Sequence, residues 1–114
     1  MSIEAIWTIR FGPIEALESE LNGGVAMIES QRVFGGDAGY AYVGDIAVVA
    51  QTVNGKLTIK RHNPSWTSMY NRDEDEFQLT FSGTLVSDSR IEGHLFRPGF
   101  PSARLLLTRF AELP

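Results

Sequence analysis

The sequence predicts an all-β protein built from about eight antiparallel strands. Segments in which apolar and polar residues alternate recur along most of the chain, and this is the pattern of half-buried strands. Turns rich in glycine, proline and asparagine separate the segments, and no strand–helix–strand spacing is present. An up-and-down barrel or a tightly closed sandwich is expected, because closing a sheet of eight strands removes its unpaired edges.

The first predicted strand covers residues 3–11, in which every second side chain is apolar and Ile6 is the exception on the polar face. A Gly-Pro pair ends this strand. Residues 13–21 carry the only helical signals: a proline that suits the first helical position, an early glutamate and a glycine beyond the end. One short helix and an irregular loop both remain open there, because about two turns are marginal without packing. The apolar face of the first strand consists of Ile3, Ala5, Trp7, Ile9 and Phe11.

Residues 24–34 predict two short strands joined by a turn. A glycine-rich turn at residues 35–39 leads into a long strand over residues 40–51. The glycine spacing is not Gly-x-Gly-x-x-Gly and a strand follows it, which excludes a nucleotide-binding loop. The long strand is apolar on both faces and is therefore the expected self-association face. Gly44 and Asp45 at its middle predict a bulge or a bend.

Asn54 and Gly55 form the strongest turn signal in the chain, and they predict a two-residue type I′ hairpin turn. The strand that follows, residues 56–62, places Leu57 and Ile59 on its inward face. The longest predicted loop comes next, and it contains large apolar side chains and an acidic run. Three more strands are predicted at residues 77–85, 90–96 and 103–110, with a loop at residues 98–101.

The length, charge and amino-acid composition limit the classes of protein to which the chain can belong. The length of 114 residues predicts one domain. The net charge of −4, with no basic cluster larger than residues 60–62, argues against direct binding of nucleic acid. The absence of cysteine excludes disulfides and thiolate sites and fits a reducing compartment. No apolar run approaches the ~20 residues that span a bilayer, and the N-terminus lacks a basic signal-peptide region. We therefore expect a cytoplasmic protein without a membrane partner.

The residues that most often carry catalysis are few and dispersed. His62 and His94 lie on predicted polar strand faces, and neither belongs to a cluster that could supply three or four ligands to a metal ion. Roles in turns account for Asp37 and Asp45 without acid–base chemistry. No nucleophile elbow and no phosphate-binding loop is present. We expect neither an enzyme nor a cofactor.

Two kinds of binding site are consistent with the pattern. Aromatic side chains on the predicted strands are candidates to line a small-ligand cavity at a barrel mouth, although filling the core is the more common arrangement in a small barrel. The loop of residues 63–76 is a candidate protein-binding site, with a solvated loop as the alternative, because clustered charge beside large apolar residues suits a basic partner surface. The candidate cavity residues are Trp7, Phe11, Phe34, Tyr40, Tyr42, Phe77 and Phe81, and the candidate protein-binding residues are Trp66, Tyr70, Asp73, Glu74, Asp75 and Glu76.

Several motifs follow one another in a specific order. These are Asn-Gly-Gly-Val-Ala-Met at residues 22–27, Arg-Val-Phe-Gly-Gly-Asp at 32–37, Gly-Tyr-Ala-Tyr-Val-Gly at 39–44 and Leu-Thr-Ile-Lys-Arg-His-Asn at 57–63. This order resembles the GrlR family, which consists of bacterial negative regulators of type III secretion gene expression and their relatives. The resemblance extends over residues 77–84 and the final strand, with residues 13–21 as an insertion.

The resemblance implies a lipocalin-like antiparallel barrel that forms a homodimer. It also implies binding to a transcriptional activator, partly through an exposed acidic motif in a hairpin. The corresponding hairpin here, residues 52–55, reads Thr-Val-Asn-Gly and carries no acidic residue. Taken together, the sequence predicts a non-enzymatic, protein-binding regulatory module, and the alternative is a carrier of a small apolar ligand.

Overall fold

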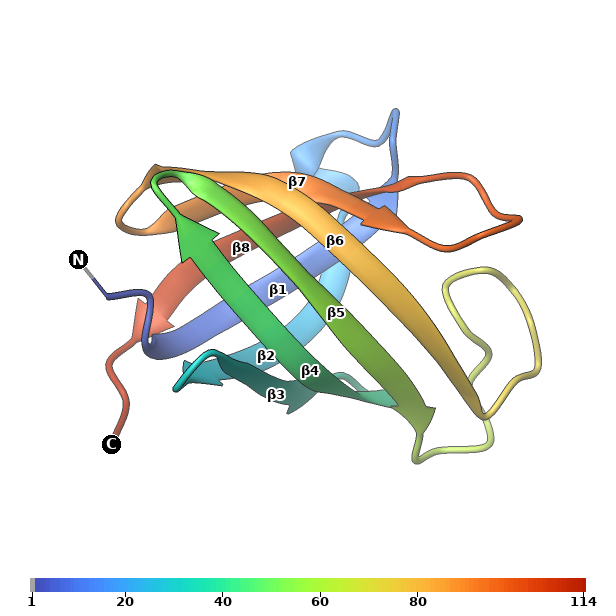
Figure 1. Ribbon diagram of the computed structural model, residues 1–114. Coiled ribbons are helices and arrows are strands. Elements are labelled where there is room, and N and C mark those ends of the chain that lie inside the picture. Colours follow the sequence, from blue (N-terminus) through green and yellow to red (C-terminus); the bar gives the residue numbers. More distant parts are fainter. Residues whose placement is uncertain (1) are drawn as a thin grey trace.

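The computed structural model describes residues 2–114 and shows a closed barrel of eight antiparallel strands (Figure 1). Each strand pairs with the next one along the chain, and the last pairs with the first. The up-and-down barrel is therefore confirmed over the sandwich. The strands are β1 (Ala5–Pro13), β2 (Asn22–Glu29), β3 (Arg32–Gly36), β4 (Tyr40–Val49), β5 (Thr52–Arg61), β6 (Glu76–Ser87), β7 (Arg90–Phe96) and β8 (Ala103–Ala111).

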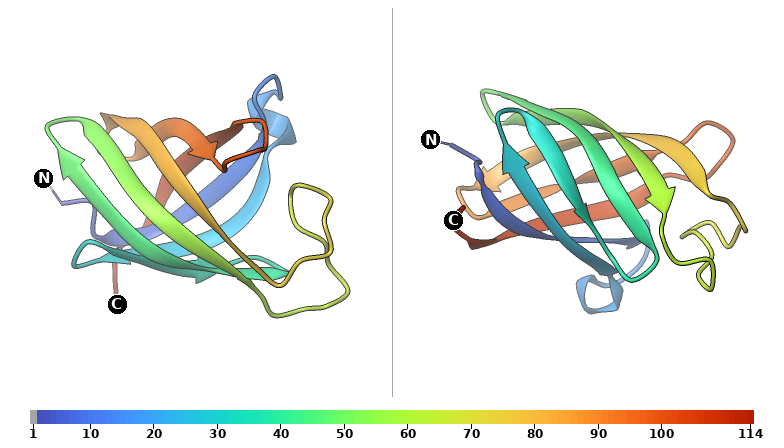
Figure 2. Two further views of the ribbon diagram at one scale, coloured as in Figure 1. Left: turned by 45° about the vertical axis from the view of Figure 1, so that its right-hand side comes forward. Right: turned by 90° about the horizontal axis from the view of Figure 1, so that it is seen from below.

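The two ends of the barrel differ. Short turns join β2 to β3, β4 to β5 and β6 to β7 at one end, which we call the closed end. The longer connections, β1–β2, β5–β6 and β7–β8, lie together at the opposite end with the β3–β4 turn (Figure 2). We call this the open end. Trp7 is 0 % exposed and belongs to one continuous interior cluster that also contains the inward side chains of every strand.

The turn predicted at Asn54 and Gly55 is wrong. Both residues lie inside β5, opposite Ala47 and Ile46 of β4. The chain instead turns at residues 50 and 51, where Ala50 has a φ of 57°. Gly55 serves packing, because a Cβ atom at this position would overlap the ring of Phe81. Glycine inside a strand often marks such a close approach of a neighbouring group.

The bulge predicted at Gly44 and Asp45 is also wrong, since the pairing of β4 with both β3 and β5 runs through these residues without a shift. The apolar residues on the two faces of this long strand have different surroundings. Tyr40, Tyr42 and Ile46 point into the barrel, whereas Val43 is 50 % exposed on the outer face.

Residues 13–21 form no α-helix, and only one 3₁₀ turn, η1 (Glu18–Glu20), is present. The segment is held against the outer face of the barrel by ion pairs. Glu18 lies 2.7 Å from Arg90 and 3.7 Å from Arg10, and Arg104 donates a 2.7 Å hydrogen bond to the Ala16 carbonyl. These contacts replace the packing that a two-turn helix would need. In the part of the chain that the structure describes, no helix has the length and apolar character needed to cross a bilayer.

Candidate functional site

A cavity of about 1040 Å³ opens at the open end of the barrel. Aliphatic side chains from the strands and aromatic side chains from strands and loops form its walls. The aliphatic residues from the strands are Ile9, Leu57, Ile59, Leu79, Leu95 and Ala103, and the aromatic residues are Phe11, Tyr40, Tyr42, Trp66, Tyr70, Phe77 and Phe100. Pockets that bind small organic molecules have this apolar character and this size.

Four of the seven aromatic residues predicted to line a cavity do so: Phe11, Tyr40, Tyr42 and Phe77. Trp7 and Phe81 are buried in the interior cluster and do not line the cavity. These two residues fill the core, which is the alternative that the sequence offered to lining a cavity.

Phe34 lies on the outer face, so its prediction as a cavity residue is wrong. It pairs with Met27 of β2 and Val43 of β4, while the preceding residue, Val33, points inward and is 3 % exposed. Side chains alternate along a strand, and the sequence of so short a strand does not indicate which face is inward. Ile14, Met69 and Phe100 line the cavity although no pattern in the sequence pointed to them.

The β3–β4 turn places a carboxylate at the cavity mouth. Asp37 Oδ1 accepts hydrogen bonds from the backbone N–H groups of Gly39 (2.9 Å) and Tyr40 (2.8 Å), and Oδ2 accepts one from the Tyr42 hydroxyl. The first two bonds are those expected of an aspartate that stabilises its own turn. Burial, and then the bond to Asp37, raise the pKa of Tyr42 above its ordinary value. Tyr42 therefore remains a neutral donor that fixes the carboxylate.

The β5–β6 loop closes over part of the mouth through an ion pair. Arg97 donates to both oxygens of Glu74, at 2.7 and 2.9 Å, and Ser68 Oγ donates to the same carboxylate at 2.6 Å. The guanidinium stacks over the rings of Phe77 and Phe100, with centroid distances of 4.4 and 4.1 Å. The side chains of Arg97 and Glu74 are each only 16 % exposed. This clamp fixes the loop on the barrel, because bidentate charged hydrogen bonds are the strong ones.

The other acidic residues of the predicted protein-binding run are paired as well. Asp73 and Asp75 lie 2.7 and 2.6 Å from Arg61, and their side chains are 84 % and 88 % exposed. Glu76 lies 3.9 Å from Lys60. The run is thus divided, since Glu74 points into the fold while its neighbours stay at the surface.

The two aromatic residues predicted for protein binding also differ. Trp66 is 51 % exposed and packs over Gly39. Tyr70 is turned toward Phe77 and Phe100, with ring centroids 5.7 and 4.7 Å away. Its hydroxyl is buried and has no hydrogen-bond partner among residues 2–114, and burial raises its pKa. The Tyr70 hydroxyl therefore remains protonated.

The ion pair between Arg97 and Glu74 predicts that the free energy of unfolding falls in acid. The hydrogen bond from Arg97, more than any other contact, lowers the pKa of Glu74 below its ordinary value. Because the pKa of Glu74 is lower in the folded than in the unfolded protein, the ion pair stabilises the fold above the unfolded pKa of about 4. This stabilisation is lost as the pH falls through the folded pKa.

Arg97→Gln is expected to lower the free energy of unfolding by about 2–3 kcal/mol at pH 7, because it leaves the Glu74 charge unpaired. At pH 3 the loss should be much smaller, and urea unfolding at the two pH values measures both. Lys60→Gln, at an exposed pair, should cost under about 0.5 kcal/mol at either pH. Equal losses for Arg97→Gln at both pH values would contradict the clamp.

Neither a protein-family model nor a curated protein matches this chain. Among residues 2–114, no group of three or more acidic, histidine or cysteine side chains is arranged to hold a metal ion. The features that describe the site are therefore its apolar cavity, its ring of aromatic side chains and the carboxylate of Asp37.

Proposed function

We propose that the protein binds one small, largely apolar molecule in the cavity at the open end of the barrel. The observation that carries this proposal is the cavity itself, about 1040 Å³ in volume and lined mainly by aliphatic and aromatic side chains. A barrel of eight strands has an interior that either is filled by side chains or holds one small ligand. Here the closed end is filled and the open end is not. This supports the ligand-binding alternative over the regulator that the sequence favoured first.

The polar groups at the mouth support binding in preference to catalysis. The Tyr40 hydroxyl donates a 2.6 Å hydrogen bond to the Glu74 carbonyl, and the Tyr42 hydroxyl donates to Asp37. Both hydroxyls therefore hold the β5–β6 loop or the β3–β4 turn in place. A catalytic base would instead need to reach a substrate proton within hydrogen-bond distance.

Titration with N-phenyl-1-naphthylamine, a neutral dye whose emission rises in apolar surroundings, tests the proposal. We expect saturable binding of one dye per chain, with a Kd on the order of 1–10 µM, because only apolar contacts hold the dye. Fluorescence enhancement and its shift to shorter wavelength provide the measurement. An enhancement that does not saturate, or one that exceeds one dye per chain, would contradict a single site.

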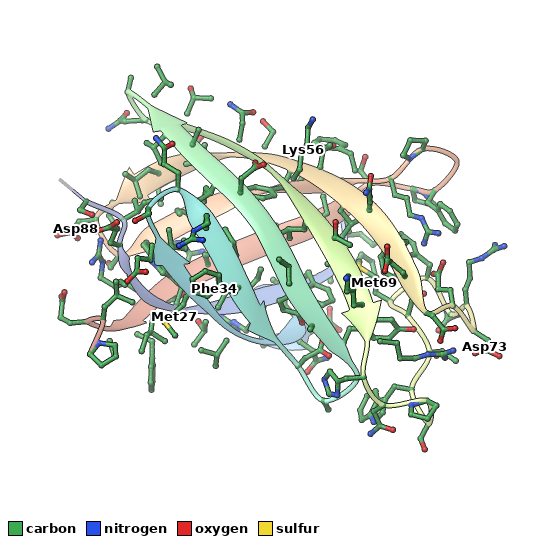
Figure 3. All side chains as sticks on the ribbon, turned by 60° about the horizontal axis from the view of Figure 1, so that its bottom comes forward. Met27, Phe34, Lys56, Met69, Asp73 and Asp88 are labelled. Carbon is green, nitrogen blue, oxygen red and sulfur yellow. The ribbon has the colours of Figure 1, made fainter. Side chains whose placement is uncertain are left out.

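A second candidate function, protein binding through self-association, is supported by an exposed apolar surface. We define the outer apolar patch as Val25, Met27, Phe34 and Val43. Figure 3 shows Met27 and Phe34 on adjacent strands of one face, and Val25 and Val43 are 47 % and 50 % exposed. Contiguous apolar surface of this kind marks interaction sites.

The charges beside the patch favour a second copy of the chain as the partner. Across β2 to β5, the neighbouring row of paired residues is Glu29, Arg32, Asp45 and Lys56. The row begins with an acid and ends with a base. A two-fold axis that lies in the interface and runs parallel to the strands through the patch would place Glu29 of one copy near Lys56 of the other, which is the reciprocal kind of contact found in an isologous interface. We accordingly propose a homodimer; the regulatory role that the GrlR resemblance implies, through a transcriptional activator, belongs with this second candidate.

Phe34→Ser is expected to weaken this dimer at least about tenfold by removing the largest apolar group of the patch. Phe96→Ser provides a matched control, because Phe96 is 40 % exposed on β7, away from the patch. Sedimentation equilibrium measures the dimer constant of all three proteins. A wild-type protein that is monomeric at several hundred micromolar, or a Phe34→Ser protein that dimerises as tightly as wild type, would reject the interface.

A further inference from the structure

We propose that the cavity selects apolar cations, such as alkylammonium ions, over anions of equal chain length; this inference rests on the proposed ligand-binding function. The charged residues that line the cavity are all acidic. Glu15 and Asp37 lie at the mouth, and none of the lining residues that the structure describes is lysine, arginine or histidine. The apolar walls increase the influence of these two charges, because a low dielectric weakens screening.

Asp37 carries a charge that the fold does not neutralise. Its carboxylate is half-buried and fixed by three donors, the N–H groups of Gly39 and Tyr40 and the hydroxyl of Tyr42, and all three are uncharged. Within residues 2–114, no basic side chain lies within 4.0 Å of this carboxylate. The Asp37 carboxylate is therefore able to pair with a cationic group of a ligand.

Two arginines near the mouth already have acidic partners, whereas a third, Arg72, lies over the ring of Phe100 at 5.3 Å and is not a lining residue of the cavity. The guanidinium of Arg97 is bound to both oxygens of Glu74, and Arg61 is shared between Asp73 and Asp75. His62 Nε2 lies 2.9 Å from the backbone carbonyl oxygen of Asp37. Because no cationic side chain lines the cavity among the residues that the structure describes, an anionic ligand inside it would be desolvated without a charged partner, which is costly.

Two aromatic rings at the mouth add to the preference for a cation. Phe11 and Tyr42 meet edge to face with ring centroids 6.2 Å apart, and among the described residues no arginine is stacked over either ring. The face of an aromatic ring attracts a cation and repels an anion. We infer that the ammonium group lies at the mouth beside Asp37 and that the alkyl chain extends toward the aliphatic residues Ile9, Leu57 and Leu79.

Competition between matched amphiphiles tests the inference. Decyltrimethylammonium and decyl sulfate have the same alkyl chain and opposite charge, and each is titrated below its micelle concentration against bound N-phenyl-1-naphthylamine. We expect the ammonium to displace the dye at a concentration about tenfold lower than the sulfate. Asp37→Asn should reduce this ratio to below about threefold, and Glu15→Gln, an exposed position that spares the turn, should reduce it part of the way.

Asp88→Asn is the control for net charge. Asp88 is exposed in the β6–β7 turn at the closed end, far from the mouth (Figure 3), so this variant should keep the wild-type ratio. Equal displacement by ammonium and sulfate, with the dye still bound, would overturn the charge preference and leave ligand binding intact. Loss of the preference in Asp88→Asn would assign it to the overall charge and reject the site. Failure of the dye to bind would reject both proposals.

Discussion

Trp7→Ala is expected to remove about 3–5 kcal/mol from the free energy of unfolding. The Trp7 side chain is fully buried in the interior cluster on β1. Its indole Nε1 donates a 2.8 Å hydrogen bond to the Ile3 carbonyl, and the Arg109 guanidinium lies over the ring at 5.1 Å. The substitution therefore both creates a cavity and breaks a partly buried hydrogen bond. Because small domains are stable by only about 5–15 kcal/mol, this loss is a large share of the total.

Trp66→Ala is the internal comparison, because the only other tryptophan is 51 % exposed in the β5–β6 loop. It should cost less than about 1 kcal/mol. Urea unfolding followed by far-ultraviolet circular dichroism measures both variants without relying on tryptophan emission. Similar losses for Trp7→Ala and Trp66→Ala would show that the closed end is not the packed core described above.

Ala103→Phe is expected to raise the Kd of N-phenyl-1-naphthylamine at least about tenfold. Ala103 lies at the start of β8, is 4 % exposed and lines the cavity opposite Leu95 in the β7–β8 pairing. A benzyl group there extends into space that the ligand would occupy. Because that space is open, the added ring should change the free energy of unfolding by less than about 1 kcal/mol. Insertion into a filled core would instead cost about 1–3 kcal/mol.

Ala47→Phe repeats the same chemical change on the exposed outer face of β4. Dye binding should be unchanged in this variant, which separates blocking of the cavity from a general effect of an added aromatic ring. Undiminished dye binding by a folded Ala103→Phe protein would contradict a ligand site in the barrel.

Local patterns account for what the sequence predicted correctly. In β6, Phe77, Leu79 and Phe81 alternate with polar residues, and all three are buried as expected. Leu57 and Ile59 of β5 follow the same rule. The alternation arises from the geometry of a single strand, so it can be read without knowing which strands are neighbours.

The errors occurred where a neighbouring strand decides the role of a residue. Gly55 matches a hairpin turn by its local sequence, yet it serves to accommodate the ring of Phe81, 26 positions later. Phe34, which the sequence predicts to be interior, lies outside beside Met27 and Val43. Close approaches and strand faces of this kind follow from register, and short segments do not specify register.

The candidate site was predictable only in part for the same reason. Phe11 and Phe77 were identified because they lie on the inward faces of regular strands. The contributions of the loops were not, since the pairing of Glu74 with Arg97 joins residues 23 positions apart. The acidic run looked uniform in sequence, and the clamp on one of its four members became visible only with the fold.

Methyl-group NMR during titration with N-phenyl-1-naphthylamine tests the central claim, that the ligand site lies inside the open end of the barrel. We expect the methyl resonances of Leu79, Leu95 and Ile59, which line the cavity, to shift together and saturate at one dye per chain. The methyls of Val25 and Val43 on the outer apolar patch should remain in place. Shifts confined to Val25 and Val43, with the cavity methyls unchanged, would place the dye on the outside of the barrel and contradict the account.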